Sequence, residues 1–213
     1  MQTYSHYIIT AALNRVWKKN EQRSGPLALA GYTLPPVKTA PLMLGSILPD
    51  IPLILLSLGA IGYDRMRGIK MSFDNDPTHS LTAWLFDYAF FNVWWVKALH
   101  NLFHAPFMVL AYLGIGYWLW RRGRAWGAGL FWLAVACLIH TAIDIPLHYD
   151  DGPLLLFPFN WTLRFYSPVS YWDPRRYGNI VGPLEHLLIL GLLVYLLVGW
   201  WRDRALRRQA AAA

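Results

Sequence analysis

Five long apolar runs constrain the fold of this chain more than any other feature of the sequence. They lie at residues 41–63, 81–96, 103–120, 125–147 and 184–201. The last three are close to the roughly 20 residues that a helix needs to cross a bilayer. Charged residues make up 15% of the chain, whereas soluble domains carry about 25%. We therefore predict an all-α polytopic membrane helix bundle that forms a single domain over residues 1–213.

The positive charges of the chain are concentrated beside these runs. The net charge is +7, and two arginine clusters follow apolar runs, at residues 121–124 and 202–208. Such clusters are typical of cytoplasmic flanks, whereas nucleic-acid binding needs a basic face on a soluble module. We predict no nucleic-acid partner and a cytoplasmic basic tail at 202–213. The run 125–147 then leads outward, and residues 148–183 form an outer loop.

The stretch 138–152 carries potential metal ligands at helical spacing. His140, Asp144 and His148 are four residues apart, so in a helix they share one face, each about 40° from the last. Asp144 lies in an apolar run, where an uncompensated carboxylate is costly to bury. A metal ion bound with the flanking imidazoles would neutralise it. A hydrogen-bonded network that packs helices without an ion is the alternative.

Three other segments offer ligands that could join this cluster. His6 lies near the apolar side of a predicted amphipathic helix at residues 3–18. Asp50 is flanked by two prolines, which break a helix and free backbone carbonyl groups. His100 and His104 stand at positions i and i+4 at the start of the third run, a spacing that can bind one ion. We predict that these residues converge at the outer rim.

Convergence sets the predicted topology. For Asp50 to reach His140, the run 41–63 has to lead from the outside inward, which places the basic residues at 15–23 outside. The run 81–96 is short and carries Asp87, so it can cross with a tilt, lie in the interface or re-enter. The chain then has five crossings if this run spans, and four if the N-terminus is inside.

The outer loop supplies candidates for catalysis and for substrate binding. His148, Asp150 and Glu185 are predicted general-base candidates, because they lie near the cluster in sequence or at the same rim. The loop is rich in proline and aromatic residues, which suits the lipid headgroup layer. Three arginines could also donate to a phosphate, so the loop is a candidate substrate cap: Arg164, Arg175 and Arg176.

These residues together resemble a known family. The combination consists of Ser5-His6, Gly-x-x-x-Pro-Asp at residues 45–50, a His pair opening a run, and His-x-x-x-Asp at 140–144 followed by Gly-x-x-x-x-x-Pro at 152–158. It resembles the bacterial membrane-bound metal-dependent hydrolases, a group linked distantly to the zinc-dependent phospholipase C fold. The resemblance implies metal ligation by His6, Asp50, one or both of His100 and His104, His140 and Asp144.

One element of that family differs here. The family's His-Arg-Gly-x-Thr-His-Ser motif is not reproduced, since the segment from His100 to His104 is one residue tighter and Thr78-His79-Ser80 matches only its end. This difference leaves open which histidine takes that place in the site.

The expected function is that of a membrane-bound hydrolase in the bacterial inner (plasma) membrane. It would use a divalent metal, zinc before manganese or iron, to cleave an ester or phosphoester, with a membrane lipid as partner and candidate substrate. A structural polar cluster and a metal-ion permease are the alternatives. A permease spreads ionisable groups through the membrane depth, whereas this chain gathers them at one end.

Overall fold

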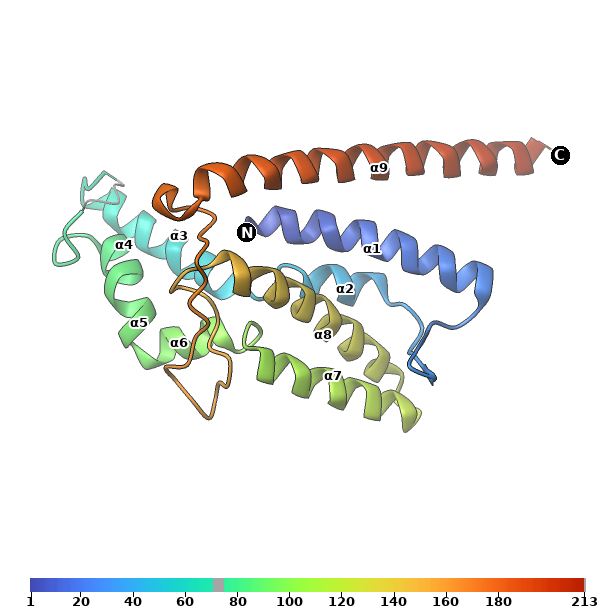
Figure 1. Ribbon diagram of the computed structural model, residues 1–213, viewed down its shortest axis with the longest axis horizontal. Helices are drawn as coiled ribbons and strands as arrows, with labels where there is room; N and C mark the ends of the chain where they lie inside the picture. Colours follow the sequence, from blue (N-terminus) through green and yellow to red (C-terminus); the bar gives the residue numbers. More distant parts are fainter. Residues whose placement is uncertain (71–74, 213) are drawn as a thin grey trace.

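The computed structural model describes residues 1–70 and 75–212, and this part of the chain is mostly helical (Figure 1). The helices are α1 (Thr3–Ser24), α2 (Thr39–Gly45), α3 (Ile51–Met66), α4 (Leu81–Ala83), α5 (Phe90–Asn92), α6 (Trp94–Asn101), α7 (Pro106–Arg121), α8 (Ala125–Asp144) and α9 (Gly178–Ala212). A π-helical turn, η1 (Trp84–Ala89), and two 3-10 turns, η2 (Ile145–Leu147) and η3 (Pro174–Arg176), complete them. The prediction of an all-α fold is confirmed.

The only strands in the described residues are two short ones. β1 (Ala28–Leu29) and β2 (Tyr32–Thr33) pair antiparallel, with Ala28 opposite Thr33 and Leu29 opposite Tyr32. This small hairpin follows α1 and reverses the chain before α2 begins.

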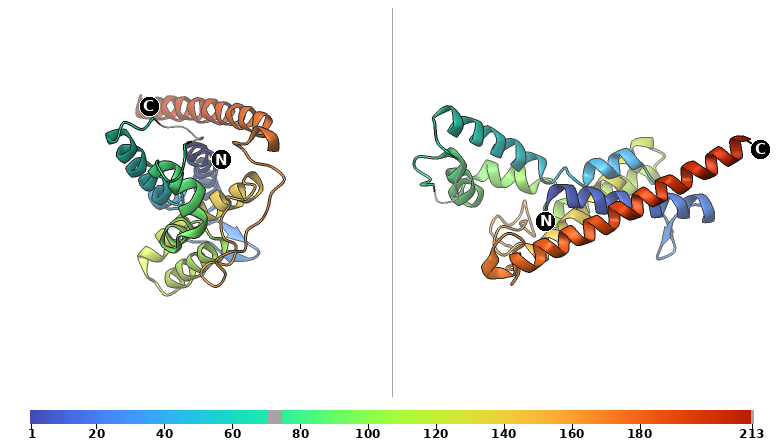
Figure 2. Two further views of the ribbon diagram at one scale, coloured as in Figure 1. Left: turned by 90° about the vertical axis from the view of Figure 1, so that its left-hand side faces the viewer. Right: turned by 90° about the horizontal axis from the view of Figure 1, so that it is seen from above.

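Helix α8 is the centre of the bundle. It packs against α7 on one side and against α2 on the other, while α1 and α9 lie next to each other (Figures 1 and 2). The core between α2 and α8 is built from Leu42, Phe131, Trp132 and Ala136. The Trp132 indole donates a hydrogen bond to the carbonyl oxygen of Pro35 at 3.1 Å, which satisfies the one polar atom of this buried side chain.

A second part of the bundle, from α3 to α6, is held by its own small core. Ala60, Leu85, Ala89 and Val96 pack together there. The Asp64 carboxylate accepts hydrogen bonds from the Ser80 hydroxyl at 2.7 Å and the Leu81 N–H at 2.8 Å. An acceptor at this point satisfies N–H groups that the start of a helix leaves free.

Two helices are long and apolar enough to cross a membrane. They are α8 together with η2, and α9. Helices α6 and α7 add a third candidate if they are counted as one span with a 45° bend. The described chain therefore offers two or three candidate spans, and the predicted number of four to five is not supported.

Breaks in two apolar runs explain the difference. The run 41–63 is split between α2 and α3 by the turn at residues 46–50, which leaves 16 residues in α3. The run 81–96 contains η1 and is interrupted at Val93, whose backbone is extended. Neither run supplies a continuous helix of about 20 residues.

The basic ends of α1 and α9 lie together, which corrects the predicted topology. The Arg15 guanidinium and the Lys19 ammonium contact the Asp203 carboxylate at 2.7 and 3.4 Å. The basic residues at 15–23 therefore do not lie on the opposite face from the tail. Helix α2 leads away from this basic end and α3 continues beyond it (Figure 1). Asp50 reaches the cluster because it lies at the break between these helices.

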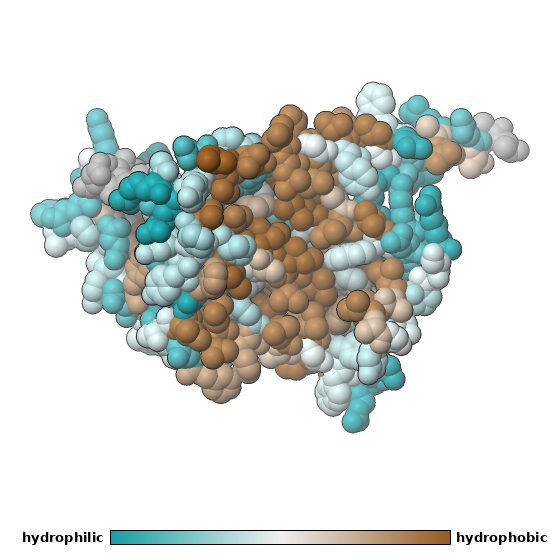
Figure 3. All heavy atoms as spheres, in the orientation of Figure 1, coloured by the Kyte–Doolittle hydropathy of each residue, from teal (hydrophilic) through white to brown (hydrophobic). Residues whose placement is uncertain are grey.

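The surface of the bundle matches a membrane environment. Figure 3 shows an apolar band across the middle of the visible face, with hydrophilic residues at both ends. Helix α9 is mostly exposed, and its exposed apolar side chains include Leu184, Leu187, Leu190, Leu197 and Trp201. Transfer of such a long apolar surface from water into lipid is favourable.

We expect a methyl group at Gly45 to destabilise the fold, because a Cβ there would clash with the Leu133 carbonyl oxygen in α8. Gly45→Ala should cost about 1–3 kcal/mol and lower the thermal unfolding midpoint of the detergent-solubilised protein. Gly59→Ala is the matched control, since a Cβ at that position in α3 meets nothing within 4 Å. Equal midpoints for the two variants would contradict the close packing of α2 on α8.

Candidate metal centre

Buried ligands from four parts of the chain meet beside the end of α8. His6 comes from α1, Asp50 from the turn before α3, His104 from the turn before α7, and His140 and Asp144 from the last turns of α8. All are buried except Asp50, whose side chain is 20% exposed. The predicted convergence of these five residues is found in the structure.

Asp144 is the centre of this cluster. Its Oδ1 lies 3.0 Å from His6 Nε2. Its Oδ2 lies 3.1 Å from His140 Nε2 and 3.2 Å from His104 Nε2. Three imidazoles therefore face one carboxylate that is only 2% exposed.

Asp50 adds a second carboxylate on the far side of His140. Its Oδ1 lies 3.3 Å from His140 Nε2, and its Oδ2 accepts a hydrogen bond from the Thr3 hydroxyl at 2.5 Å. The local sequence explains this position, because Pro52 stands in the first turn of α3 and favours the start of a helix there. The carboxylate that ends the break thus points into the bundle.

The backbone sets the orientation of the His140 ring. His140 Nδ1 lies 2.8 Å from the carbonyl oxygen of Ser46. A carbonyl oxygen only accepts, so Nδ1 carries the proton and donates. In the neutral ring, Nε2 then presents a lone pair to the two carboxylates, an arrangement found in metal-binding histidines. Lone pairs that face each other need a cation or a proton between them.

A metal ion is one way to satisfy this cluster. His6 and His140 are stacked, with ring centroids 3.6 Å apart and planes 15° apart, so two charged rings would repel. The buried ring nitrogens of His6 and His104, and Nε2 of His140, make no hydrogen bond to any residue in the described part of the chain. Unsatisfied buried nitrogens of this kind are the donors that a cation uses.

The separations of the donor atoms also fit an ion. His6, His140 and Asp144 each offer one ligand atom, and these atoms all lie within 4.8 Å of one another. A tetrahedral ion with bonds of 2.0–2.1 Å separates its ligand atoms by about 3.4 Å. The distances from His6 Nε2 to Asp144 Oδ1 and from His140 Nε2 to Asp144 Oδ2, 3.0 and 3.1 Å, are close to this value, although they involve different oxygens of the carboxylate. These three residues can hold a metal ion, and His104 and Asp50 lie beside them.

The protonation of the flanking groups agrees with this role. Burial lowers the pKa of His6 and outweighs the opposite effect of the neighbouring Asp144 carboxylate. Burial alone would raise the pKa of Asp50, but the nearby His140 imidazole and the Thr3 hydroxyl outweigh it and lower the pKa. A neutral imidazole and an ionised carboxylate are the forms that bind metals.

His148 lies at the edge of the cluster and has a carboxylate partner. Its Nε2 lies 3.8 Å from Asp144 Oδ1, and its Nδ1 lies 3.1 Å from Asp151 Oδ1. The Trp172 indole donates to the other Asp151 oxygen at 3.0 Å. Burial would raise the pKa of Asp151, but His148 and Trp172 outweigh it and lower the pKa. The Met1 amino nitrogen lies 3.0 Å from Asp144 Oδ1 and 3.3 Å from His148 Nε2.

Three predicted site residues lie elsewhere. The His100 ring is buried and packs edge-on against His104, with centroids 4.8 Å apart, and neither of its nitrogens is hydrogen-bonded within residues 1–70 and 75–212. Asp150 lines a pocket in the loop between η2 and α9. The Glu185 carboxylate accepts hydrogen bonds from the Ser5 hydroxyl at 2.6 Å and the Gln2 N–H at 2.9 Å, so it holds the start of α1 against α9.

The sequence-based reasoning missed Asp151 and Thr3. Asp151 stands three residues after His148 and next to Asp150, so the spacing could have suggested either carboxylate as its partner. The contact from Thr3 to Asp50 spans 47 residues, and no local pattern marks it. Comparison with protein-family models, curated proteins and solved structures finds no match to this chain.

We expect the purified protein to bind about one divalent ion per chain, since one cluster of three buried ligands supplies the site. His140→Ala and Asp144→Asn should each lower the metal content by about tenfold or more, because each removes a ligand. Elemental analysis by mass spectrometry after gentle purification measures this. His79→Ala is the control, because this imidazole is 82% exposed. Equal metal content in all four proteins would contradict the site.

Proposed function

We propose that this protein is a membrane-bound metal-dependent hydrolase that cleaves an ester or phosphoester of a membrane lipid. The observation that supports this most is that a cluster able to hold a cation lies beside an imidazole with its own carboxylate partner, His148 with Asp151. The motifs shared with the bacterial membrane-bound metal-dependent hydrolases support the same proposal.

The cluster would hold the ion through His6, His140 and Asp144, with His104 and Asp50 as further ligands. Zinc is the proposed ion, because imidazole and carboxylate donors suit it, and manganese or iron could replace it. When bound, such an ion polarises a scissile carbonyl or phosphoryl group and lowers the pKa of a water. Ser46 and Thr3 position the ligands His140 and Asp50 through their hydrogen bonds.

His148 is the proposed general base. Its imidazole lies next to Asp144, and Asp151 Oδ1 is 3.1 Å from its Nδ1. A carboxylate this close to the ring stabilises its charged form after it takes a proton. Trp172 holds Asp151 in turn. Asp150 and Glu185 are the other predicted bases. Within the described residues, neither carboxylate contacts a residue of the cluster.

The position of the site supports a lipidic substrate. Basic side chains gather where α1 and α9 end, and basic flanks favour the cytoplasmic side. The metal centre lies toward the opposite ends of these helices (Figure 1). We therefore propose a bacterial inner membrane as the location of the protein, with the site toward the outer face, where ester and phosphoester groups of lipids lie.

The two alternatives have less support. A structural cluster would satisfy its buried nitrogens with well-aligned hydrogen bonds, whereas those of His6 and His104 form none among the described residues, and their Nε2 atoms only lie close to the Asp144 carboxylate, at 3.0 and 3.2 Å. A permease would place ionisable groups along its path through the membrane, whereas these ligands gather at one level of the bundle, beside the end of α8.

We expect His148→Ala to lower kcat for a lipid ester or phosphoester by about 10²–10⁴-fold, the range that a general base supplies, while the metal stays bound. Asp151→Asn should lower kcat less, because the base remains and only the stabilisation of its charged form is weakened. His140→Ala should lose turnover and metal together. The assay follows product release from lipids in nanodiscs, with a chelator and metal readdition.

Metal-loaded wild-type protein without turnover on any ester or phosphoester lipid would overturn the hydrolase proposal. Full kcat in His148→Ala would instead overturn the assignment of the base alone.

A further inference from the structure

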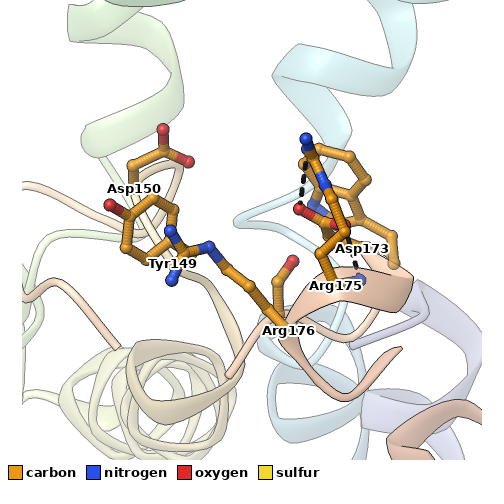
Figure 4. Close-up of a pocket in the computed structure, with 7 residues that line it drawn as sticks. Tyr149, Asp150, Asp173, Arg175 and Arg176 are labelled. Atoms are coloured by element: carbon orange, nitrogen blue, oxygen red, sulfur yellow. Dashed lines mark hydrogen bonds and ion pairs between the residues drawn. The ribbon is translucent and has the colours of Figure 1, made fainter. Parts of the chain in front are cut away.

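The outer loop contains a pocket of about 390 Å³ that the metal centre does not include. Its walls are Tyr149, Asp150, Ser170, Trp172, Asp173, Arg175 and Arg176 (Figure 4). Pockets that hold small ligands begin near this volume, at about 300 Å³. Its lining is charged and aromatic, which suits a polar ligand.

One pair of charges in this pocket is already satisfied. The Arg175 guanidinium donates to both oxygens of the Asp173 carboxylate, each at 3.0 Å (Figure 4). The Asp173 carboxylate also accepts from the Arg175 N–H at 2.9 Å. Arg175 and Asp173 therefore neutralise each other and offer little to a ligand.

Arg176 is the cationic group that is left. Its guanidinium carbon lies 3.1 Å from the centre of the Tyr149 ring (Figure 4). The guanidinium forms no ion pair or hydrogen bond with any residue that the structure describes, while the Arg176 carbonyl accepts from the Ser170 N–H at 2.9 Å and fixes the backbone. A half-buried guanidinium with free N–H donors in a fork is a site for a phosphate.

Asp150 and Ser170 are also without partners. The Asp150 carboxylate makes no hydrogen bond or ion pair within the described ranges, and it is half-buried beside Tyr149. Ser170 is fully buried, and its hydroxyl has no partner there either. A buried hydroxyl that lines a pocket and lacks a hydrogen bond is available to a ligand atom.

The pocket is coupled to the metal centre through its walls. Tyr149 directly follows His148, and the Tyr171 N–H donates to the carbonyl oxygen of Leu147 at 3.0 Å. Trp172 lines the pocket and binds Asp151, which contacts His148. The walls of the pocket are therefore linked to the base of the proposed reaction through Trp172 and Asp151.

We propose that this pocket binds a zwitterionic phosphodiester, with its phosphate on Arg176 and Ser170 and its ammonium group on Asp150. One free positive and one free negative group in the same pocket, Arg176 and Asp150, match a ligand that carries both charges. The headgroup of an ethanolamine phospholipid has this chemistry. The inference rests on the proposed function, because it names the headgroup that the hydrolase would hold.

Calorimetry on the full-length protein tests this in detergent micelles with a metal chelator, so that no turnover occurs. The probes are glycerophosphoethanolamine and glycerophosphoglycerol, which share the phosphodiester and differ in the ammonium group. We expect the first to bind one per chain and about tenfold tighter than the second, as one lost charged contact implies. Equal affinities, or no binding of either probe, would overturn the proposal.

Variants test which residue binds each charged group of the probe. Arg176→Gln should weaken both probes by about tenfold or more, and Arg176→Lys should restore part of the loss because it keeps the charge without the fork. Asp150→Asn should weaken only glycerophosphoethanolamine. The matched control is Arg67→Gln, since Arg67 also lies over a tyrosine ring, that of Tyr63, but outside the pocket. Unchanged binding in Arg176→Gln or in Asp150→Asn would overturn the assignment.

Nanodiscs distinguish a lipid headgroup from a soluble zwitterion as the natural ligand of the pocket. Resident ethanolamine lipids should compete with added glycerophosphoethanolamine, so its affinity should be lower in such discs than in discs of phosphatidylglycerol. Equal affinity in both would overturn the lipid source and assign the pocket to a soluble zwitterion.

The same data distinguish the two proposals. Headgroup binding without any metal-dependent turnover would support the headgroup pocket and overturn the hydrolase proposal. Turnover without headgroup binding would support the hydrolase proposal and overturn the headgroup pocket.

Discussion

The burial of the Asp144 carboxylate at the end of an apolar helix is the constraint on which the rest of this structure depends. An ionised carboxylate that is 2% exposed costs several kcal/mol unless charges or hydrogen bonds compensate it. The chain supplies three imidazoles within 3.2 Å of its oxygens. They come from α1, α8 and the turn before α7, so compensating this one charge requires these segments to meet.

Two turns between helices make this meeting possible. Continuous helices would carry Asp50 and His104 past the cluster, but the turn at 46–50 and the turn between α6 and α7 stop the chain beside α8. The first break also exposes the Ser46 carbonyl, which orients His140 at 2.8 Å. The turn at 46–50 also shortens the helices on either side of it, so the run 41–63 supplies no candidate span. This turn therefore affects both the site and the number of candidate spans.

Much of the site could be predicted from the sequence, because its logic is local. The spacing of His140 and Asp144 places them on one helix face, and the prolines around Asp50 mark a break that faces the interior. The number of spans could not be predicted, because hydropathy does not distinguish a straight helix from one interrupted by a π-helical turn at 84–89. The face of the bundle on which the basic residues at 15–23 lie depends on the contact of Arg15 with Asp203. This contact joins positions that are far apart in sequence, so no local pattern predicts it. The partner of His148 was missed because two adjacent aspartates compete for it.

The central claim is that His6, His140 and Asp144 together bind one metal ion. X-ray absorption spectroscopy at the zinc edge of the zinc-loaded protein tests it most directly. The account predicts a shell of nitrogen and oxygen ligands at about 2.0–2.2 Å with the outer-shell scattering of at least two imidazoles, lost in His140→Ala. A shell without imidazole scattering, or a spectrum that His140→Ala leaves unchanged, would contradict it.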